Sequence, residues 1–260
     1  MKSTSVALVM TAVMLGGAGA VSAQTDGTRP ATTTFLGDTG LWFVPSAEVL
    51  PAGEFSASVY RTESDFEQGN TNVSFFPATA GFGLGRVELF GSLRVVTRID
   101  RDTSPLLFTG PDNEVGGLVN EHPTVHQTWT GNKLGDLFLG GKFNLVSQQH
   151  QYPVAVAMRG TVKLPTGDRD AGAGTGEYDG FFDVIGSGAA GGMELAAFAG
   201  VAMRGDPDDI KISDGVRWGA GVGFPTRSQL RATAEVHGEW ALDREVLAPA
   251  GFRRTKRRAA

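Results

Sequence analysis

A sustained alternation of apolar and polar side chains over residues 85–99 is the feature that most restricts how this chain can fold. Val87, Leu89 and Leu93 belong to the apolar set, whereas Glu88 and Arg94 belong to the polar set. A period of two residues sustained over this length predicts a β-strand rather than a helix. The segment also exceeds the ~9–11 residues that a tilted strand needs to cross the hydrocarbon layer of a membrane.

The same alternation returns along most of the chain. We interpret the following residues as strands: 54–62, 70–76, 85–99, 135–146, 152–164, 178–188, 193–204, 215–224 and 230–240. After residue 85, long polar connections alternate with short turns. The long connections are residues 100–133, 165–177 and 205–214, and the short turns are residues 147–151, 189–192 and 225–229. Long loops on one side and short turns on the other indicate an all-β fold, an antiparallel up-and-down outer-membrane β-barrel.

A soluble β-sandwich also alternates, so the chemistry of the two faces has to separate the interpretations. The polar faces carry charges of both signs in mid-strand, as expected for strands that share a polar barrel interior. The apolar faces end in Trp218, Phe224 and Trp240, which suits an aromatic girdle at the membrane interface. We therefore favour the barrel and predict these lumen-lining residues: Arg86, Glu88, Arg94, Arg98, Asp136, Lys142, Arg159, Lys163, Arg231, Glu235, His237 and Glu239.

The N-terminus predicts export. Lys2 precedes an apolar stretch at residues 6–15, and small residues lead to Ala23, so residues 1–23 read as a cleaved signal peptide. The alternative is an uncleaved anchor helix. Cysteine is absent, so an exported chain must be held by its core or by its membrane. The formal net charge of −5 gives no indication of a nucleic-acid partner.

The remaining segments set the expected domain organisation. Residues 24–39 are polar and are interpreted as a periplasmic leader, and residues 40–240 as the barrel. Pro45 and Pro51 interrupt the apolar start of that region, and proline cannot donate to a strand ladder. Residues 40–51 are therefore either an edge strand or an inner plug.

The strand count predicts an incomplete barrel. About nine strands are found, whereas bacterial barrels close with an even number. We expect a barrel of about 10–12 strands that is incomplete at its C-terminus. Residues 241–260 lack alternation and end in a basic run, as an irregular or frameshifted tail would. The alternative is a genuine basic tail that touches lipid phosphates.

Several blocks resemble a known family. GDLFLGGKFNL at 135–145, RGTVKLPTGD at 159–168, RWGAGVGFP at 217–225 and ATAEVHGEW at 232–240 resemble the outer-membrane barrels named for the meta-pathway of phenol degradation. Residues 40–60 resemble the entry segment of related Gram-negative barrels, some of which carry an OmpA-type peptidoglycan-binding domain. The resemblance implies an outer-membrane location, with lipid and lipopolysaccharide as partners. It implies a contact with peptidoglycan only through a C-terminal domain that this sequence lacks.

The sequence contains only poor matches to the motifs of metal-binding or catalytic sites. Residues 168–179 resemble a calcium loop, but Ala173 stands where the turn requires glycine. Pro123 separates His122 from His126 and would break a helix that places both on one face. No nucleophile elbow is found, so we predict no catalytic residue, metal site or cofactor. The expected function is porin-like passage of small molecules. The alternatives are a structural barrel that anchors the envelope through an OmpA-type domain, and an outer-membrane barrel enzyme.

Overall fold

A computed structural model describes residues 33–65, 71–101, 131–150, 152–169, 171–207, 210–226, 230–242 and 247–249. The fold is all-β, and the described part holds one 3-10 turn, η1 (Gln148–His150), and no α-helix. The strands are β1 (Phe55–Val59), β2 (Thr62–Asp65), β3 (Thr71–Gly83), β4 (Val87–Arg101), β5 (Gly131–Lys133), β6 (Leu137–Val146), β7 (Ala155–Leu164), β8 (Asp179–Ala190), β9 (Met193–Arg204), β10 (Ile210–Ile212), β11 (Gly215–Phe224), β12 (Ala232–Ala241) and β13 (Leu247–Pro249).

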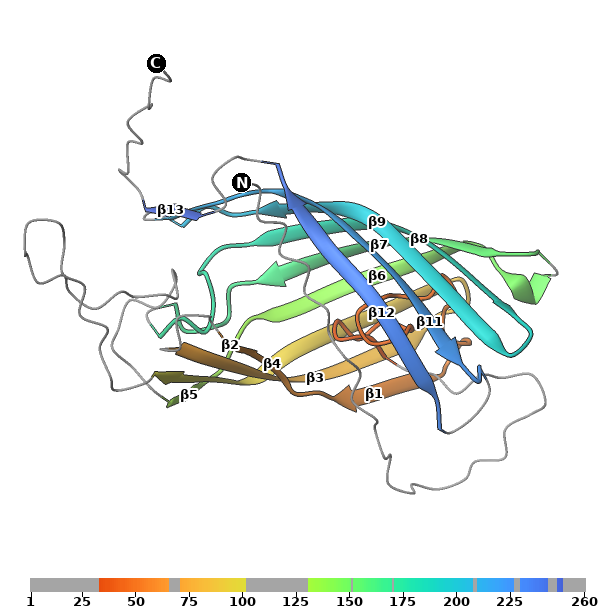
Figure 1. The fold of residues 1–260 in the computed structure, drawn as a ribbon, viewed down its shortest axis with the longest axis horizontal. Coiled ribbons are helices and arrows are strands. Elements are labelled where there is room, and N and C mark those ends of the chain that lie inside the picture. The colour runs from red at the N-terminus through yellow and green to blue at the C-terminus, as the bar shows by residue number, and fades with distance from the viewer. Residues whose placement is uncertain are drawn as a thin grey trace, which may run out of the picture.

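Eleven of the described strands form one antiparallel up-and-down sheet. Its main path runs β1-β3-β4-β6-β7-β8-β9-β11-β12, with β2 paired to β3 and β5 to β4. A separate two-stranded sheet joins β10 to β13. Figure 1 shows the large sheet curled into a half-barrel. In the described residues no ladder joins β1 to β12, so the sheet is open along these two strands. This architecture fits the predicted incomplete barrel.

The predicted alternation separates the two faces of the sheet. Along β7 the concave face holds buried side chains such as Arg159, while Met158 and Val162 on the convex face are exposed. On β6, Lys142 is fully buried, whereas Leu139 and Phe143 are exposed. Apolar side chains point outward and charged side chains point inward, which is the reverse of a soluble protein core.

A β-bulge interrupts this alternation on β4. Phe76 pairs with Val96 and Pro77 pairs with Arg94, so Val95 has no partner on β3. A bulge inserts one extra residue and so reverses which side chains face inward beyond it. Pro77 lies at the bulge, where a residue without an N–H is tolerated. The predicted strand 70–76 stopped at this proline, whereas β3 continues through it to Gly83.

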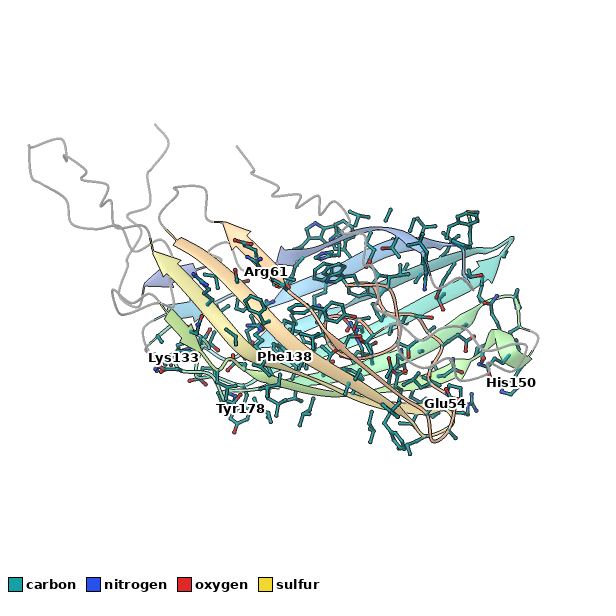
Figure 2. The ribbon with its side chains drawn as sticks, turned by 90° about the horizontal axis from the view of Figure 1, so that it is seen from below. Glu54, Arg61, Lys133, Phe138, His150 and Tyr178 are labelled. Atoms are coloured by element: carbon teal, nitrogen blue, oxygen red, sulfur yellow. The ribbon has the colours of Figure 1, made fainter. Side chains whose placement is uncertain are left out.

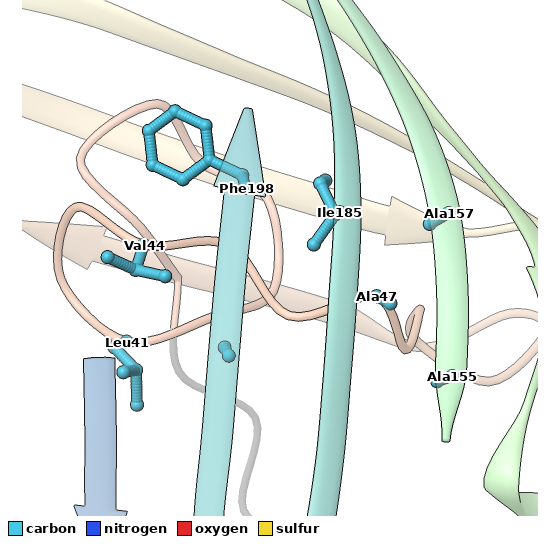
Figure 3. Packing of buried hydrophobic residues seen from close by; sticks show 8 residues of the cluster. Leu41, Val44, Ala47, Ala155, Ala157, Ile185 and Phe198 are labelled. Carbon is cyan, nitrogen blue, oxygen red and sulfur yellow. The ribbon is translucent and has the colours of Figure 1, made fainter. Parts of the chain in front are cut away.

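Residues 33–51 form an irregular segment on the concave face, which we call the inner segment (Figure 1). This resolves the two alternatives for residues 40–51 in favour of the plug. The expected leader ended at residue 39, but residues 33–39 belong to the same inner segment. Its apolar side chains pack on three strands in a cluster of Leu41, Val44, Ala47, Ala155, Ala157, Ile185, Ala196 and Phe198 (Figure 3).

The inner segment lies against the end of the sheet that carries the short turns. The Glu48 carboxylate accepts hydrogen bonds from Ser147 Oγ (2.7 Å) and Gln148 N–H (2.9 Å), in the turn between β6 and β7. Gly37 has φ of 106° and comes so near the Gly91 carbonyl that a Cβ would clash. Glycine is required there because only glycine combines this backbone conformation with such a close approach.

At the long-loop end, residues 165–177 fold back onto the concave side. Ala171 and Ala173 are buried, and the Gly167 N–H donates to Asp136 Oδ1 at 3.0 Å. Several predictions lie outside the described residues: the signal peptide at 1–23, most of the loop at 100–133 and most of the tail at 241–260. Within the described parts, no helix has the length and hydropathy to cross a membrane.

Candidate functional site

The most deeply buried charges join the inner segment to the sheet. Arg159 donates from Nη1 to Asp38 (3.0 Å to Oδ1), and from Nε and Nη2 to Asp183 Oδ2 (2.9 and 2.7 Å). Lys142 Nζ lies 3.2 Å from Glu88 Oε2 and 3.5 Å from Asp38 Oδ2. We call Asp38, Glu88, Lys142, Arg159 and Asp183 the buried charge cluster. Its members are at most 1% exposed.

The cluster also satisfies the backbone of the inner segment. The Thr39 N–H and hydroxyl both donate to Glu88 Oε1, at 2.6 and 3.0 Å, while Lys142 Nζ donates to the Thr39 carbonyl at 2.9 Å. An irregular segment has no ladder of its own, so side chains of the sheet must supply its hydrogen-bond partners. The charges of β4 and β6 therefore help to specify where the inner segment lies.

Glu235 on β12 plays the same part on the opposite side of the inner segment. Its carboxylate accepts hydrogen bonds from three successive N–H groups, those of Trp42, Phe43 and Val44, each at 2.8 Å. The His237 ring lies 4.5 Å from the Phe43 ring. The predicted lumen residues Glu235 and His237 thus lie on the concave face but are covered by the inner segment.

A second group of charges holds the folded loop at the long-loop end. Lys163 Nζ lies 2.7 Å from Asp179 Oδ2 and 3.7 Å from Asp136 Oδ2, and it donates to Thr175 Oγ1 at 2.6 Å. Asp136 and Lys163 are predicted lumen residues, and both are buried on the concave side.

Two further predicted residues form ion pairs between strands on the same face. Arg231 lies 2.6 Å from Glu194 on β9, and Glu239 lies 2.5 Å from Arg204, also on β9.

Two predicted residues lie elsewhere. Arg98 is exposed beyond the bulge, while Thr97 takes the buried position beside it, because the extra residue Val95 reverses the alternation. Arg86 lies in the turn before β4, where its guanidinium donates to the carbonyls of Asn144 and Leu145. It stacks 5.6 Å from the ring of Phe143, which points outward. Neither side chain belongs to the concave face, so both predictions are corrected.

Between the buried charge cluster and the folded loop lies a band of arginines and aromatic rings. Arg94 stands 4.4 Å from the Phe75 ring and 5.0 Å from the Phe138 ring. Arg217 stands 4.8 Å from the Phe181 ring and 5.7 Å from the Phe198 ring. The Phe138 and Phe181 rings are 6.4 Å apart and join the two halves. We call these residues the arginine–aromatic belt: Phe75, Arg94, Phe138, Phe181, Phe198 and Arg217.

The order of residues along β6 and β8 places the belt between the two groups of charges. On β8, Phe181 stands two residues from Asp179 of the loop group and two residues from Asp183 of the buried charge cluster. On β6, Phe138 lies between Asp136 and Lys142. Figure 2 labels Phe138 among the side chains within the curl of the sheet.

Sequence reasoning missed several members of these groups. Asp38 was assigned to a leader, and Asp183 lies on a strand whose alternation has weak contrast. Arg217, Asp179, Glu194 and Arg204 also face the concave side through the contacts above. Charged residues in the inward-facing register of β8, β9 and β11 were a signal that could have found them. Asp38 had no such signal, because the inner segment has no period.

A metal site was not predicted, and the described residues hold no group of three or more His, Asp or Glu arranged to bind a metal ion. The loop acid Asp168 pairs with Lys133 at 2.8 Å and accepts from the Ala171 N–H. The candidate His122 and His126 lie outside the described residues.

Comparison with known proteins identifies the family. The family model described as "Putative MetA-pathway of phenol degradation" matches residues 56–253. The chain belongs to this family. No curated protein matches the chain. The match to the phenol-degradation family begins within β1 and covers the concave-face residues from Glu88 to Glu239. The inner segment, with Asp38, precedes the matched region.

Proposed function

We propose that this protein is an outer-membrane barrel that allows small molecules to pass along its concave face. The observation that carries the proposal is the inversion of the two faces. Leu89, Leu139 and Val162 are each about half exposed on the convex face, whereas Glu88, Lys142 and Arg159 are buried on the concave face. Lipid is the solvent that favours exposed apolar side chains on successive strands, and it fits a barrel with a polar interior.

Membrane lipid and lipopolysaccharide are the partners that this arrangement suits. The convex face exposes large apolar side chains on β4, β6, β7, β8, β9 and β12. Soluble monomers rarely expose contiguous apolar patches larger than a few hundred Å². The family to which the chain belongs supports the same location, and export through a signal peptide at residues 1–23 would deliver the chain there.

Charges along the concave face support passage with a bias for charge. Groups of opposite sign on facing strands set up fields that select solutes by charge. The inner segment occupies the short-turn end, so a solute must pass beside it or displace it. Because Arg159 binds Asp38 and Glu235 binds the Phe43 N–H from opposite sides of this segment, those contacts are the ones that passage would have to loosen.

The inner segment also favours a second candidate. A barrel whose interior is filled by its own chain suits a structural role, and small barrels are commonly filled in this way. In an envelope-anchoring protein, the attachment to peptidoglycan would come from a separate OmpA-type domain. An enzymatic role has no observation in its favour.

Conductance separates the two candidates. The full chain is refolded into detergent and added to planar bilayers, with folding checked by heat-modifiable gel mobility. Passage predicts discrete conductance steps that become larger or more frequent in Asp38→Asn, because that variant weakens the hold of Arg159 on the inner segment. A folded protein that conducts in neither form would support the structural barrel and overturn passage.

A further inference from the structure

Among the described residues, Arg94 differs from the other concave-face cations in having no carboxylate within ion-pair distance. The nearest carboxylate oxygens to five others lie at 2.5–3.2 Å, those five being Lys142, Arg159, Lys163, Arg204 and Arg231. Arg217 stands 4.0 Å from Asp183. The Arg94 guanidinium contacts two rings, and in the described portion of the chain it forms no salt bridge. The nearby carboxylates of Asp136 and Asp179 are already paired with Lys163.

Polar atoms without a hydrogen-bond partner in the described residues lie within the belt and on strands next to it. Arg94 Nε is buried without a hydrogen-bond partner, and so is Thr161 Oγ1, on a side chain that is 2% exposed. Thr161 pairs with Phe181 across the ladder between β7 and β8, and the Phe181 ring contacts Phe138. Asp183 Oδ1, close to Arg217, also lacks a hydrogen bond. Buried polar atoms left unsatisfied are destabilising, so such a group requires an explanation.

We propose that the arginine–aromatic belt binds a small organic anion that has a flat apolar body. The planar guanidinium of Arg94 matches the geometry of a carboxylate and can donate to both of its oxygens. The rings of Phe138 and Phe181 offer faces and edges for the apolar body. Thr161, on β7 between the strands of Phe138 and Phe181, supplies a hydroxyl. As the solute class for passage, this anion rests on the proposed function. Binding of the anion does not itself require passage.

The belt discriminates against other classes of small molecule. A cation in the belt would meet Arg94 and Arg217, with repulsion that is strong where water is scarce. A neutral ring would gain the Phe138 and Phe181 contacts but would leave the Arg94 donors unmatched. A small anion such as acetate would satisfy Arg94 but would leave the rings without a partner.

Equilibrium binding tests the proposal directly. Benzoate is titrated by calorimetry into the refolded full chain in detergent, with benzyl alcohol and acetate as probes that lack the charge and the flat body. We expect saturable benzoate binding, with affinities for both other probes at least about tenfold weaker. Equal affinity for benzyl alcohol would overturn the anion site, equal affinity for acetate would overturn the role of the rings, and no saturable benzoate binding would overturn both.

Matched variants locate the site. Arg94→Gln should raise the Kd for benzoate at least about tenfold, which corresponds to about 1.4 kcal/mol. Arg98→Gln is the matched control, because Arg98 lies four residues later on the same strand but is exposed and does not face the concave side. It should leave the Kd unchanged. A purely structural role for Arg94 predicts wild-type affinity in folded Arg94→Gln. If Arg94→Gln does not fold, Thr161→Val decides: it should fold at least as well as the wild type and bind benzoate several-fold more weakly.

The outcomes for binding and for passage remain distinguishable. Benzoate binding that depends on Arg94, in a protein that shows no conductance, would keep the site and overturn passage. Conductance without saturable benzoate binding would keep passage and overturn the site.

Discussion

The concave face differs between the buried charge cluster and the arginine–aromatic belt. In the cluster, both cations have carboxylate partners, and Asp38 of the inner segment is one of them. In the belt, Arg94 forms no ion pair among the described residues, and Arg217 stands 4.0 Å from its nearest carboxylate. The two regions share strands β4, β6 and β8, so the strand framework alone does not explain the difference. It comes from the inner segment, which brings an acid and backbone partners to one level of the interior.

The comparison separates charges that stabilise the fold from charges that remain able to bind a solute. Charges removed from water are tolerated when they are paired and hydrogen-bonded. The cluster meets that condition and acts as the polar core of the short-turn end. The belt charges are only partly paired and hydrogen-bonded, so a ligand that pairs with them would bind more favourably there.

The largest expected effect comes from breaking the cluster. Arg159→Met leaves Asp38 and Asp183 buried without their main partner, and losing one member of a buried ion pair costs about 3–5 kcal/mol. Arg94→Met removes two cation–π contacts, which are worth about 0.5–2 kcal/mol each. Urea unfolding of the refolded proteins, followed by tryptophan fluorescence, measures both. A loss for Arg94→Met as large as that for Arg159→Met would contradict the distinction between the two regions.

A smaller effect is expected from Asp38, which joins the inner segment to the sheet. Asp38→Asn should weaken this attachment by about 1.5–3 kcal/mol, as for a hydrogen bond to a charged group, while Arg159 keeps Asp183. Limited proteolysis at residues 33–51, compared with cleavage elsewhere in the chain, measures the attachment. Glu54→Gln, at an exposed carboxylate just outside the inner segment, is the matched control and should show the wild-type pattern.

The same contact predicts a dependence on pH. Burial raises the pKa of Asp38, but the ion pairs with Arg159 and Lys142 outweigh it and hold the pKa below its ordinary value. The stabilisation is therefore complete above the unfolded carboxyl pKa of about 3.9 and is lost as the pH falls from there through the lower folded pKa. Cleavage at residues 33–51 should increase in that acid range for the wild type. If Asp38→Asn shows an equal increase, another group is responsible.

The smallest expected effect compares two buried threonines. Thr79 shares hydrogen bonds with Thr33 Oγ1 (3.2 Å) and the Ser58 carbonyl (3.3 Å), whereas Thr161 Oγ1 has no partner. Thr79→Val should cost about 0.5–1.5 kcal/mol, while Thr161→Val should be neutral or stabilising because no hydrogen bond is lost. Urea midpoints measure both. A loss of stability in Thr161→Val would show that its hydroxyl is already satisfied.

Most of the sheet could be predicted from local alternation. Nine predicted strands correspond to the main path from β1 to β12, and the first of them covers β1 but ends at Thr62, where β2 begins. Alternation needs only neighbouring residues, so it is visible in a single sequence. It cannot show where the ladder slips. The bulge opposite Pro77 depends on how β3 pairs with β4, and for that reason Arg98 was assigned to the wrong face.

The inner segment was harder to predict because its position depends on distant residues. Asp38 and Arg159 are separated by 121 positions, and Glu235 lies 192 positions after Phe43. Pro45 and Pro51 indicated that residues 40–51 could not form an ordinary strand, which left the plug as one of two alternatives. The partners of its N–H groups become visible only when the sheet curls around it.

The proposed membrane barrel depends most directly on which face of the sheet contacts lipid. The natural chain has no cysteine, so Leu89→Cys and Ser92→Cys each introduce one site for an environment-sensitive fluorophore, on the convex and the concave face of β4 respectively. After refolding into liposomes, the label at position 89 should emit as in an apolar environment and be quenched by spin-labelled lipid. The label at position 92 should resist this quencher. Lipid quenching at position 92 but not at position 89 would show that the concave face contacts lipid, and would contradict the proposed orientation.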